Sequence, residues 1–226
     1  VRTGNVDGAL VQRHSGKLQL RPRPLPLRPS IGRVRKLLDR GAEISTAEMA
    51  LESAIPVEVY GQEGVGKTAL LKHLAQLITV EHTKDNFPGG ALYHGQVGAT
   101  PAADLLQFVF ESVYETDQPY KPRLADLQKL LYDQRLLILL DDVRMPRAEL
   151  EAVLDTAPNC GFMLTAPERH LLGVMRGIQL TGLPTAEAVS LLESTLGRPL
   201  ADSERDAAAR LCEALDGHPL HIQQAA

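Results

Sequence analysis

Cysteine is scarce in this sequence, and its two cysteines, Cys160 and Cys212, lie far apart. They do not have the close spacing of metal ligands, and a chain of 226 residues with two cysteines is not a disulfide scaffold. We interpret them as free thiols of a protein in a reducing compartment, which favours a cytoplasmic location.

Long apolar runs are also missing. No run is long enough to span a bilayer, and no continuous apolar segment follows the basic residues near the start, so we expect neither a membrane helix nor a secretory signal. The length and the 44% hydrophobic content suit one large or two small globular domains. The chain begins at Val1 and stops at Ala226 inside a predicted helix, so we expect a fragment of a longer protein.

Acidic residues are rare near the start, although the net charge of the chain is -4. Residues 1–40 contain ten Lys/Arg and two Asp/Glu, whereas the remaining residues contain 14 and 26. A basic arm can bind nucleic acid or an anionic membrane. Here the charges alternate with prolines (RPRPLPLRPS, Arg21–Ser30), which is typical of an extended linker. We therefore predict that residues 1–28 form a basic, Pro-rich arm or linker.

A phosphate-binding loop is the strongest motif in the chain. The segment Val57–Ala75 reads VEVYGQEGVGKTALLKHLA, a β-branched run, a Gly-rich turn and a helical pattern. Glycines allow a tight turn whose backbone N–H groups converge on phosphates at a helix N-terminus. A lysine at the end of such a loop reaches the β- and γ-phosphates, and a threonine hydroxyl binds Mg²⁺. The residues expected to contact nucleotide here are Gly61, Gly64, Val65, Gly66, Lys67, Thr68 and Ala69.

Two adjacent carboxylates follow a second strand pattern, LLILLDDV at Leu136–Val143. The aliphatic run has the length of a strand that is covered on both faces. We expect Asp141 to hold Mg²⁺ opposite Thr68, and Asp142 to orient or deprotonate an attacking water. The predicted catalytic residues are thus Lys67 and Asp142, and the predicted metal ligands are Thr68 and Asp141.

Strand and helix patterns alternate up to about residue 182. Further strands are predicted at 89–97, 162–165 and 178–182, with helical patterns at 105–113 and 124–131. The capping-box spacing of Ser45 and Glu48 predicts a helix over about 46–54. This alternation predicts an α/β fold, a three-layer P-loop domain with a mostly parallel five-stranded sheet over residues 29–181.

Only helical patterns follow. Leu191, Leu192 and Leu196 belong to one apolar stripe, Ser203 is a candidate N-cap for a second helix that ends at Gly217, and Pro219 suits the first position of a third helix. These patterns predict a small all-α domain over residues 182–226.

The order of motifs resembles the NB-ARC module, the nucleotide-binding part of STAND signalling ATPases. The matching segments are SIGR (Ser30–Arg33), GQEGVGKT, LLILLDDV, FMLTAPER, LTGLPTAEAVSLL (Leu180–Leu192) and LDGHPL (Leu215–Leu220). The resemblance covers roughly residues 29–226. It implies ATP or ADP with Mg²⁺ as the ligands.

The resemblance also implies roles for matching positions. Ile31, Gly32 and Arg33 would border the adenine and ribose, and Pro219 would pack on the adenine from the helical domain. Thr165 would lie on the sensor strand. Members of the family commonly have an arginine two residues past this threonine, where this chain has Pro167. Arg169 is a candidate substitute.

We therefore expect an ATP/ADP-binding molecular switch of the STAND type. Nucleotide state would control domain closure and oligomerisation, and effector and sensor domains would lie outside this fragment. We expect slow hydrolysis, because Pro167 replaces the arginine that the family commonly has. A well-placed arginine contributes ~10³–10⁵ in rate. The alternatives are an ordinary P-loop ATPase or kinase-like enzyme with fast turnover, and a DNA-binding regulator. The absence of a helix-turn-helix pattern and of aromatic residues among the basic ones ranks the last alternative lowest.

Overall fold

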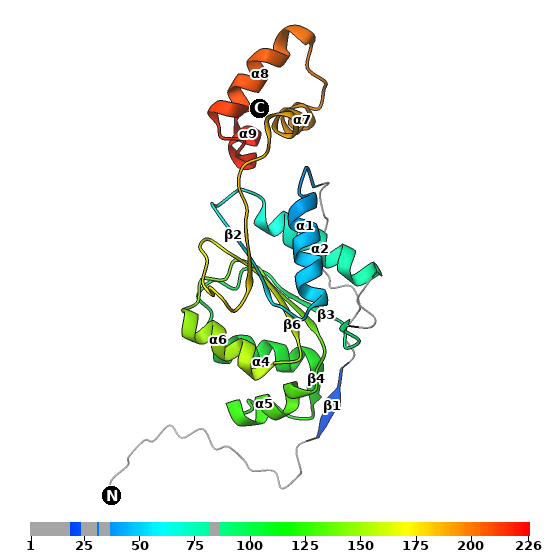
Figure 1. Ribbon diagram of the computed structural model, residues 1–226. Helices are drawn as coiled ribbons and strands as arrows, with labels where there is room; N and C mark the ends of the chain where they lie inside the picture. The colour runs from blue at the N-terminus through cyan, green and yellow to red at the C-terminus, as the bar shows by residue number, and fades with distance from the viewer. Residues whose placement is uncertain (1–18, 24–30, 32–36, 82–85) are drawn as a thin grey trace, which may run out of the picture.

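A parallel five-stranded sheet forms the centre of the larger part of the molecule (Figure 1). The computed structural model describes residues 19–23, 31, 37–81 and 86–226. The strand order is β3-β5-β6-β2-β7, and each neighbouring pair is parallel. The strands are β2 (Val57–Tyr60), β3 (Ala91–His94), β5 (Leu137–Leu140), β6 (Gly161–Ala166) and β7 (Arg176–Gln179). The predicted α/β fold with a five-stranded sheet is confirmed.

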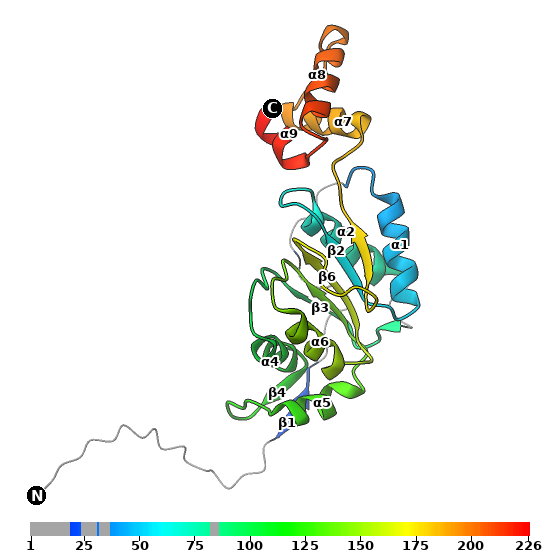
Figure 2. The ribbon, with the colours of Figure 1, turned by 60° about the vertical axis from the view of Figure 1, so that its left-hand side comes forward.

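Helices cover both faces of this sheet, which gives the three layers predicted (Figures 1 and 2). One face carries α1 (Gly41–Glu52) and α2 (Lys67–Glu81). The other carries α4 (Ala102–Val113), α5 (Leu124–Tyr132) and α6 (Arg147–Thr156). Within the described ranges, no helix combines the length and apolar character that a membrane crossing requires.

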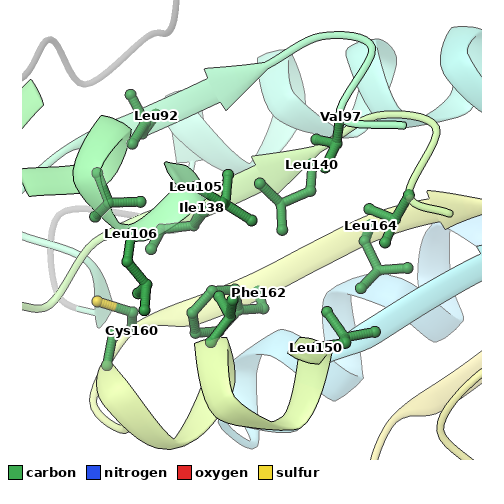
Figure 3. Packing of buried hydrophobic residues seen from close by; sticks show 14 of the residues in the cluster. Leu92, Val97, Leu105, Leu106, Ile138, Leu140, Leu150, Cys160, Phe162 and Leu164 are labelled. Atoms are coloured by element: carbon green, nitrogen blue, oxygen red, sulfur yellow. The ribbon is translucent and has the colours of Figure 1, made fainter. Parts of the chain in front are cut away.

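The two faces of β5 serve two different cores. Leu137 and Leu139 belong to the cluster under α1 and α2, whereas Ile138 and Leu140 belong to the cluster under α4 and α6 (Figure 3). Successive side chains of a strand point to opposite faces, so a strand covered on both sides must be apolar throughout. Burial of each such side chain contributes about 1.5–3 kcal/mol, which explains why this strand is an unbroken aliphatic run.

The start of α1 differs from the prediction. The helix begins at Gly41, so Ser45 and Glu48 lie inside it and form no N-terminal cap. Arg40 is buried, with 6% of the residue exposed. Its guanidinium donates hydrogen bonds to the Thr181 carbonyl oxygen at 2.6 Å and to the Glu43 carboxylate at 3.1 Å. The residue before the helix is thus held by a contact between distant segments, and the local capping pattern was misleading.

Part of the predicted N-terminal arm forms a strand. β1 (Leu20–Pro22) pairs antiparallel with β4 (Tyr114–Thr116), and Leu20 packs partly against the core under α4. Arg23 and Glu115 form an exposed ion pair across this ribbon at 3.2 Å. The rest of the arm lies outside the described residues.

Three helices follow the sheet: α7 (Thr185–Leu196), α8 (Asp202–Ala214) and α9 (Pro219–Ala225). They enclose a third core that includes Leu192, Cys212 and Ile222. Pro219 occupies the first turn of α9, as predicted. Figures 1 and 2 show the three helices at one end of the molecule, away from α4 and α5. We call residues 182–226 the helical segment.

The predicted N-cap of α8 is wrong by two residues. Ala201 is the N-cap and Ser203 lies in the first turn. The Glu204 carboxylate accepts a hydrogen bond from the Ala201 N–H at 2.9 Å, and Arg198 binds the same carboxylate at 2.8 and 2.9 Å. Glu204 therefore satisfies the end of the helix, and a serine side chain is not needed there.

Both cysteines are buried free thiols, in agreement with the prediction. Cys160 lies in the core under α4 and Cys212 in the core of the helical segment. Burial raises the pKa of Cys160 to about 11. Neither side chain has the depressed pKa of a reactive thiolate, so both are structural.

Candidate nucleotide-binding site

The Gly-rich loop joins the carboxyl end of β2 to the first turn of α2. Gly61, Gly64 and Gly66 have φ values of 147°, 81° and 107°, which side chains with a Cβ rarely adopt. A Cβ on Gly61 would collide with the Leu180 carbonyl oxygen, and one on Gly64 would lie 2.7 Å from Leu220. The spacing predicted from the sequence is thus required by the conformation of the loop.

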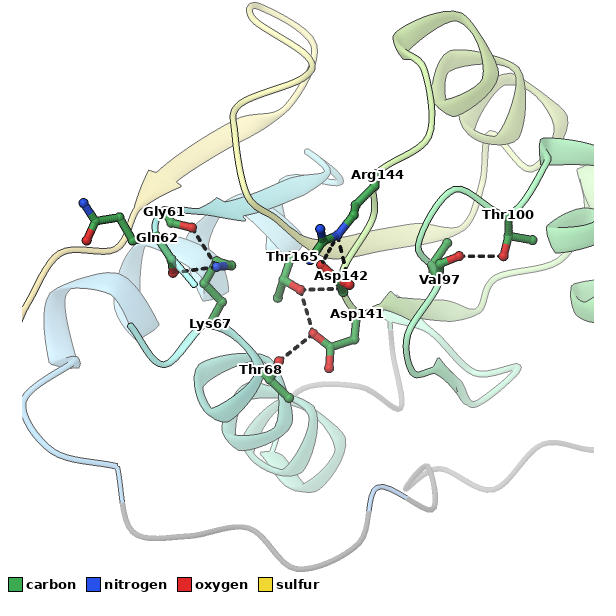
Figure 4. Close-up of polar contacts among 10 residues, drawn as sticks. All are labelled: Gly61, Gln62, Lys67, Thr68, Val97, Thr100, Asp141, Asp142, Arg144 and Thr165. Atoms are coloured by element: carbon green, nitrogen blue, oxygen red, sulfur yellow. Dashed lines mark hydrogen bonds and ion pairs between the residues drawn. The ribbon is translucent and has the colours of Figure 1, made fainter. Parts of the chain in front are cut away.

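Lys67 folds back over this loop (Figure 4). Its ammonium donates hydrogen bonds to the carbonyl oxygens of Gly61 at 2.6 Å and Gln62 at 2.8 Å. Burial lowers the pKa of Lys67, and the nearby carboxylates of Asp142, Glu63 and Asp141 act in the opposite direction. The ammonium is therefore held at the loop, where the phosphates of a bound nucleotide would lie.

Asp141 is the centre of a cluster of hydroxyl groups at the carboxyl end of β5. Its Oδ1 accepts hydrogen bonds from Thr68 at 2.9 Å and from Thr165 at 2.6 Å, and its Oδ2 accepts one from Tyr93 at 3.1 Å. Burial, followed by the Asp141 charge, raises the pKa of Tyr93, so its phenol stays protonated. Asp141 is 5% exposed, and these three donors to its carboxylate are neutral hydroxyls. A buried carboxylate of this kind is suited to a cation.

Asp142 has an unusual backbone conformation and a basic partner. Its φ is 57°, in the left-handed region, and its N–H donates to the Thr165 hydroxyl at 2.8 Å. The Arg144 Nε lies 2.9 Å from its Oδ1 and 3.2 Å from its Oδ2. Non-glycine residues in this region are uncommon and are enriched at functional sites.

These residues line one cavity of about 850 Å³ at the carboxyl edge of the sheet. Ligands of open α/β sheets bind at this edge. The residues that line the cavity are Glu63, Gly64, Gly66, Lys67, Thr68, Ala69, Lys72, Tyr93, Gly95, Gln96, Asp141, Asp142, Arg144, Thr165 and Pro167. Most of the predicted loop residues and both carboxylates therefore meet in one place.

Other predicted site residues lie elsewhere. Val65 is buried in the core under α2, and so is Ile31. Pro219 does not line the cavity, and the Arg169 guanidinium lies 6.0 Å from the centre of the Tyr60 ring, also away from the lining. Gly32 and Arg33 lie outside the described residues.

The lining residues that were not identified from the sequence include Tyr93, Lys72 and Arg144. Tyr93 follows from topology, because β3 is parallel to β5 and its carboxyl end reaches the same edge. Lys72 lies one turn beyond Lys67 in α2, with its ammonium 5.8 Å from the Tyr93 ring centre. Arg144 gave no signal beyond its position after the two aspartates.

The helical segment contacts the phosphate loop directly. His218 is buried, and its Nε2 lies 2.9 Å from the Glu63 carbonyl oxygen. Leu220 and His218 are also the side chains that a Cβ on Gly64 would meet, at 2.7 and 2.9 Å. The loop that would bind phosphates is thus also a docking surface for the start of α9.

Solved structures of other proteins share the fold of this chain. A signal-transduction ATPase with numerous domains (STAND), with a tetratricopeptide-repeat sensor, from Pyrococcus horikoshii is 20% identical over 84% of the chain, with a TM-score of 0.52. The ADP form of the ORC2 protein of Aeropyrum pernix is 18% identical over 85%, with a TM-score of 0.59. A Walker-type ATPase of Pyrococcus abyssi is 15% identical over 83%, with a TM-score of 0.54.

The chain spans 30%, 63% and 66% of these three structures, less than two thirds of each. At such identities the likeness concerns the fold. No match was found among curated proteins. A family model described as the NB-ARC domain matches residues 35–198, which include the phosphate loop and both aspartates. This chain therefore belongs to the NB-ARC family and contains a nucleotide-binding P-loop NTPase module.

Proposed function

We propose that this chain is the ATP/ADP-binding switch module of a STAND-type signalling ATPase in the cytoplasm. Nucleotide state would control how the helical segment closes on the sheet domain and, in a full-length protein with effector and sensor domains, whether copies oligomerise. Membership of the NB-ARC family supports this proposal, and so does the fold shared with a STAND protein.

The cavity offers the groups that a nucleotide phosphate chain needs. Backbone N–H groups of the loop and the Lys67 ammonium would bind the β- and γ-phosphates. The Thr68 hydroxyl and the Asp141 carboxylate would hold Mg²⁺, because both are oxygen ligands, they lie 2.9 Å apart, and the carboxylate is buried with hydroxyl donors for partners. When bound, the metal would neutralise phosphate charge.

Slow hydrolysis is part of the proposal. Asp142 is the candidate for orienting an attacking water, and its carboxylate pairs with Arg144 in the structure. The cavity wall carries Pro167 at the position where the family commonly has an arginine. A cation missing from that position reduces stabilisation of the transition state.

The observation that carries the switch proposal is the contact between His218 and Glu63. A loop that both binds phosphates and docks α9 couples the ligand to the position of the helical segment. Adenine would extend from the phosphates towards Pro219, the first residue of α9, so ADP would bridge the two parts. A ligand shifts such an equilibrium only by its difference in affinity for the two arrangements.

Small-angle X-ray scattering of the purified chain tests this proposal. We expect a smaller radius of gyration with ADP than with Mg²⁺ and the non-hydrolysable analogue ADPNP, and no ligand effect in Lys67→Ala. Pro219→Ala should bind ADP several-fold more weakly with unchanged ligand-free melting, because alanine maintains the helix and loses ~1 kcal/mol of apolar contact.

Two results would contradict the switch. One is identical scattering with both nucleotides despite saturated binding. The other is fast turnover of ATP by the monomeric chain, which would favour an ordinary P-loop ATPase.

A further inference from the structure

Arg144 is the cavity-lining arginine on the loop that follows β5, and its main chain is anchored. Its N–H donates to the Gly98 carbonyl oxygen at 2.8 Å, and the preceding Val143 is fully buried and bridges to Gly98. The side chain, in contrast, is 52% exposed. A fixed backbone with an exposed side chain lets the guanidinium change partners without moving the fold.

The partner of Arg144 in the structure is the carboxylate of Asp142, which is itself 40% exposed (Figure 4). Exposed ion pairs of this kind contribute little to stability, so a stronger anion can replace the carboxylate. The terminal phosphate of a nucleoside triphosphate is such an anion, because it offers several charged oxygens to the guanidinium fork. A nucleoside diphosphate lacks this third phosphate, the γ-phosphate.

The other described cations of the cavity are engaged differently. Lys67 donates to the carbonyl oxygens of its own loop, and Lys72 lies over the Tyr93 ring. Of these three cations, Arg144 is the one hydrogen-bonded to the carboxylate that is the candidate for orienting water. Its departure would therefore change two groups of the site at once.

We infer that Arg144 distinguishes bound triphosphate from bound diphosphate by exchanging its guanidinium between Asp142 and the terminal phosphate. With a triphosphate, the guanidinium binds the terminal phosphate and Asp142 is released to orient water. With a diphosphate, the Arg144–Asp142 pair persists and covers the carboxylate. This inference rests on the proposed nucleotide-binding function.

Nucleotide affinity of the full chain tests the exchange. Isothermal titration with ADP and with ADPNP, both with Mg²⁺, gives the affinity ratio for each variant. Arg144→Ala should reduce ADPNP affinity at least about tenfold and change ADP affinity less than about twofold, since charge-assisted hydrogen bonds of this kind are strong. Arg144→Lys should lie between Ala and the parent.

Arg147 provides a matched control. It forms a similar exposed ion pair, with Nε 2.8 Å from Glu151 and side chains 55% and 39% exposed, but it does not line the cavity. Arg147→Ala should leave both affinities unchanged. An unchanged ADPNP-to-ADP ratio in Arg144→Ala and Arg144→Lys would overturn the inference while the nucleotide-binding proposal stands.

A double variant separates exchange from simple charge effects. Asp142→Asn removes the competing charge and suits the left-handed backbone, because asparagine tolerates positive φ. It should raise ADPNP affinity several-fold, and the rise should disappear when Arg144→Ala is added. A rise that persists in the double variant would mean lost repulsion by Asp142 and would refute the exchange. A parent chain that binds neither nucleotide would refute both the proposed function and this inference.

Discussion

The imidazole Nε2 of His218 donates a hydrogen bond of 2.9 Å to the main-chain carbonyl oxygen of Glu63, which joins the helical segment to the phosphate loop. The carbonyl can only accept, so Nε2 carries the proton of this hydrogen bond. Nδ1 has no hydrogen-bond partner within the described residues. The ring also stacks on His221, with centroids 4.1 Å apart.

His218→Ala should loosen this contact. A hydrogen bond of this type contributes about 1 kcal/mol, so we expect several-fold weaker ADP binding if docking of α9 and nucleotide binding are coupled. Isothermal titration measures the affinity, and hydrogen exchange at Glu63–Val65 measures loop protection. His221→Ala, which removes the stacked ring and leaves the hydrogen bond, is the control and should change ADP affinity less. Equal affinities for parent and His218→Ala would show that docking and binding are independent.

Lys67→Ala should weaken ADP and ATP binding at least tenfold, about 1.4 kcal/mol, because it removes the ammonium at the loop. The fold should survive, since the partners of the Lys67 ammonium in the described part of the chain are carbonyl oxygens of its own loop. Calorimetric titration and circular dichroism give the two readouts, with the exposed Lys129 on α5 replaced by alanine as a control. Unchanged nucleotide affinity would contradict the assignment of the phosphate loop.

Asp141→Asn should spare ADP binding without metal and remove the Mg²⁺ dependence of ATP binding. The amide retains the size of the side chain but loses the negative charge that would hold the cation. Titrations of ADPNP with and without Mg²⁺ measure the effect. If Mg²⁺ strengthens ADPNP binding equally in parent and variant, Asp141 is not a metal ligand.

Arg198→Ala should lower stability at neutral pH and have little effect in acid. The Arg198 hydrogen bond is the largest cause that lowers the pKa of Glu204, from 4.5 to about 2. Because the folded pKa is the lower one, the stabilisation is present above pH 4.5 and disappears as the pH falls towards 2.

Thermal melting of parent and variant at several pH values checks this window. The difference in melting temperature should be small, because both side chains are exposed, and should shrink below pH 4.5. Replacement of the exposed Arg210 on α8 by alanine serves as the control. A difference that is constant with pH would contradict the role of the Arg198–Glu204 pair.

Local pattern was sufficient for the five strands of the central sheet and for most of the cavity, but not for β1 and β4. The aliphatic run of β5 predicts a strand buried on both faces because alternate side chains face two different cores. The spacing of Gly61, Gly66, Lys67 and Thr68 predicts the loop because only this backbone shape converges on phosphates. Both signals come from residues that are neighbours in sequence, and the comparisons agree with the family that they indicated.

Contacts between distant residues decided the rest, and sequence spacing carries no information on them. α1 begins at Gly41, four residues before the predicted cap, and the preceding Arg40 bonds to Thr181. Tyr93 reaches Asp141 because β3 and β5 are adjacent. The pairing of His218 with Glu63 joins residues 155 positions apart. A helix end or a site contact of this kind depends on where the packed sheet and helices bring two groups together, and that is determined only when the chain folds.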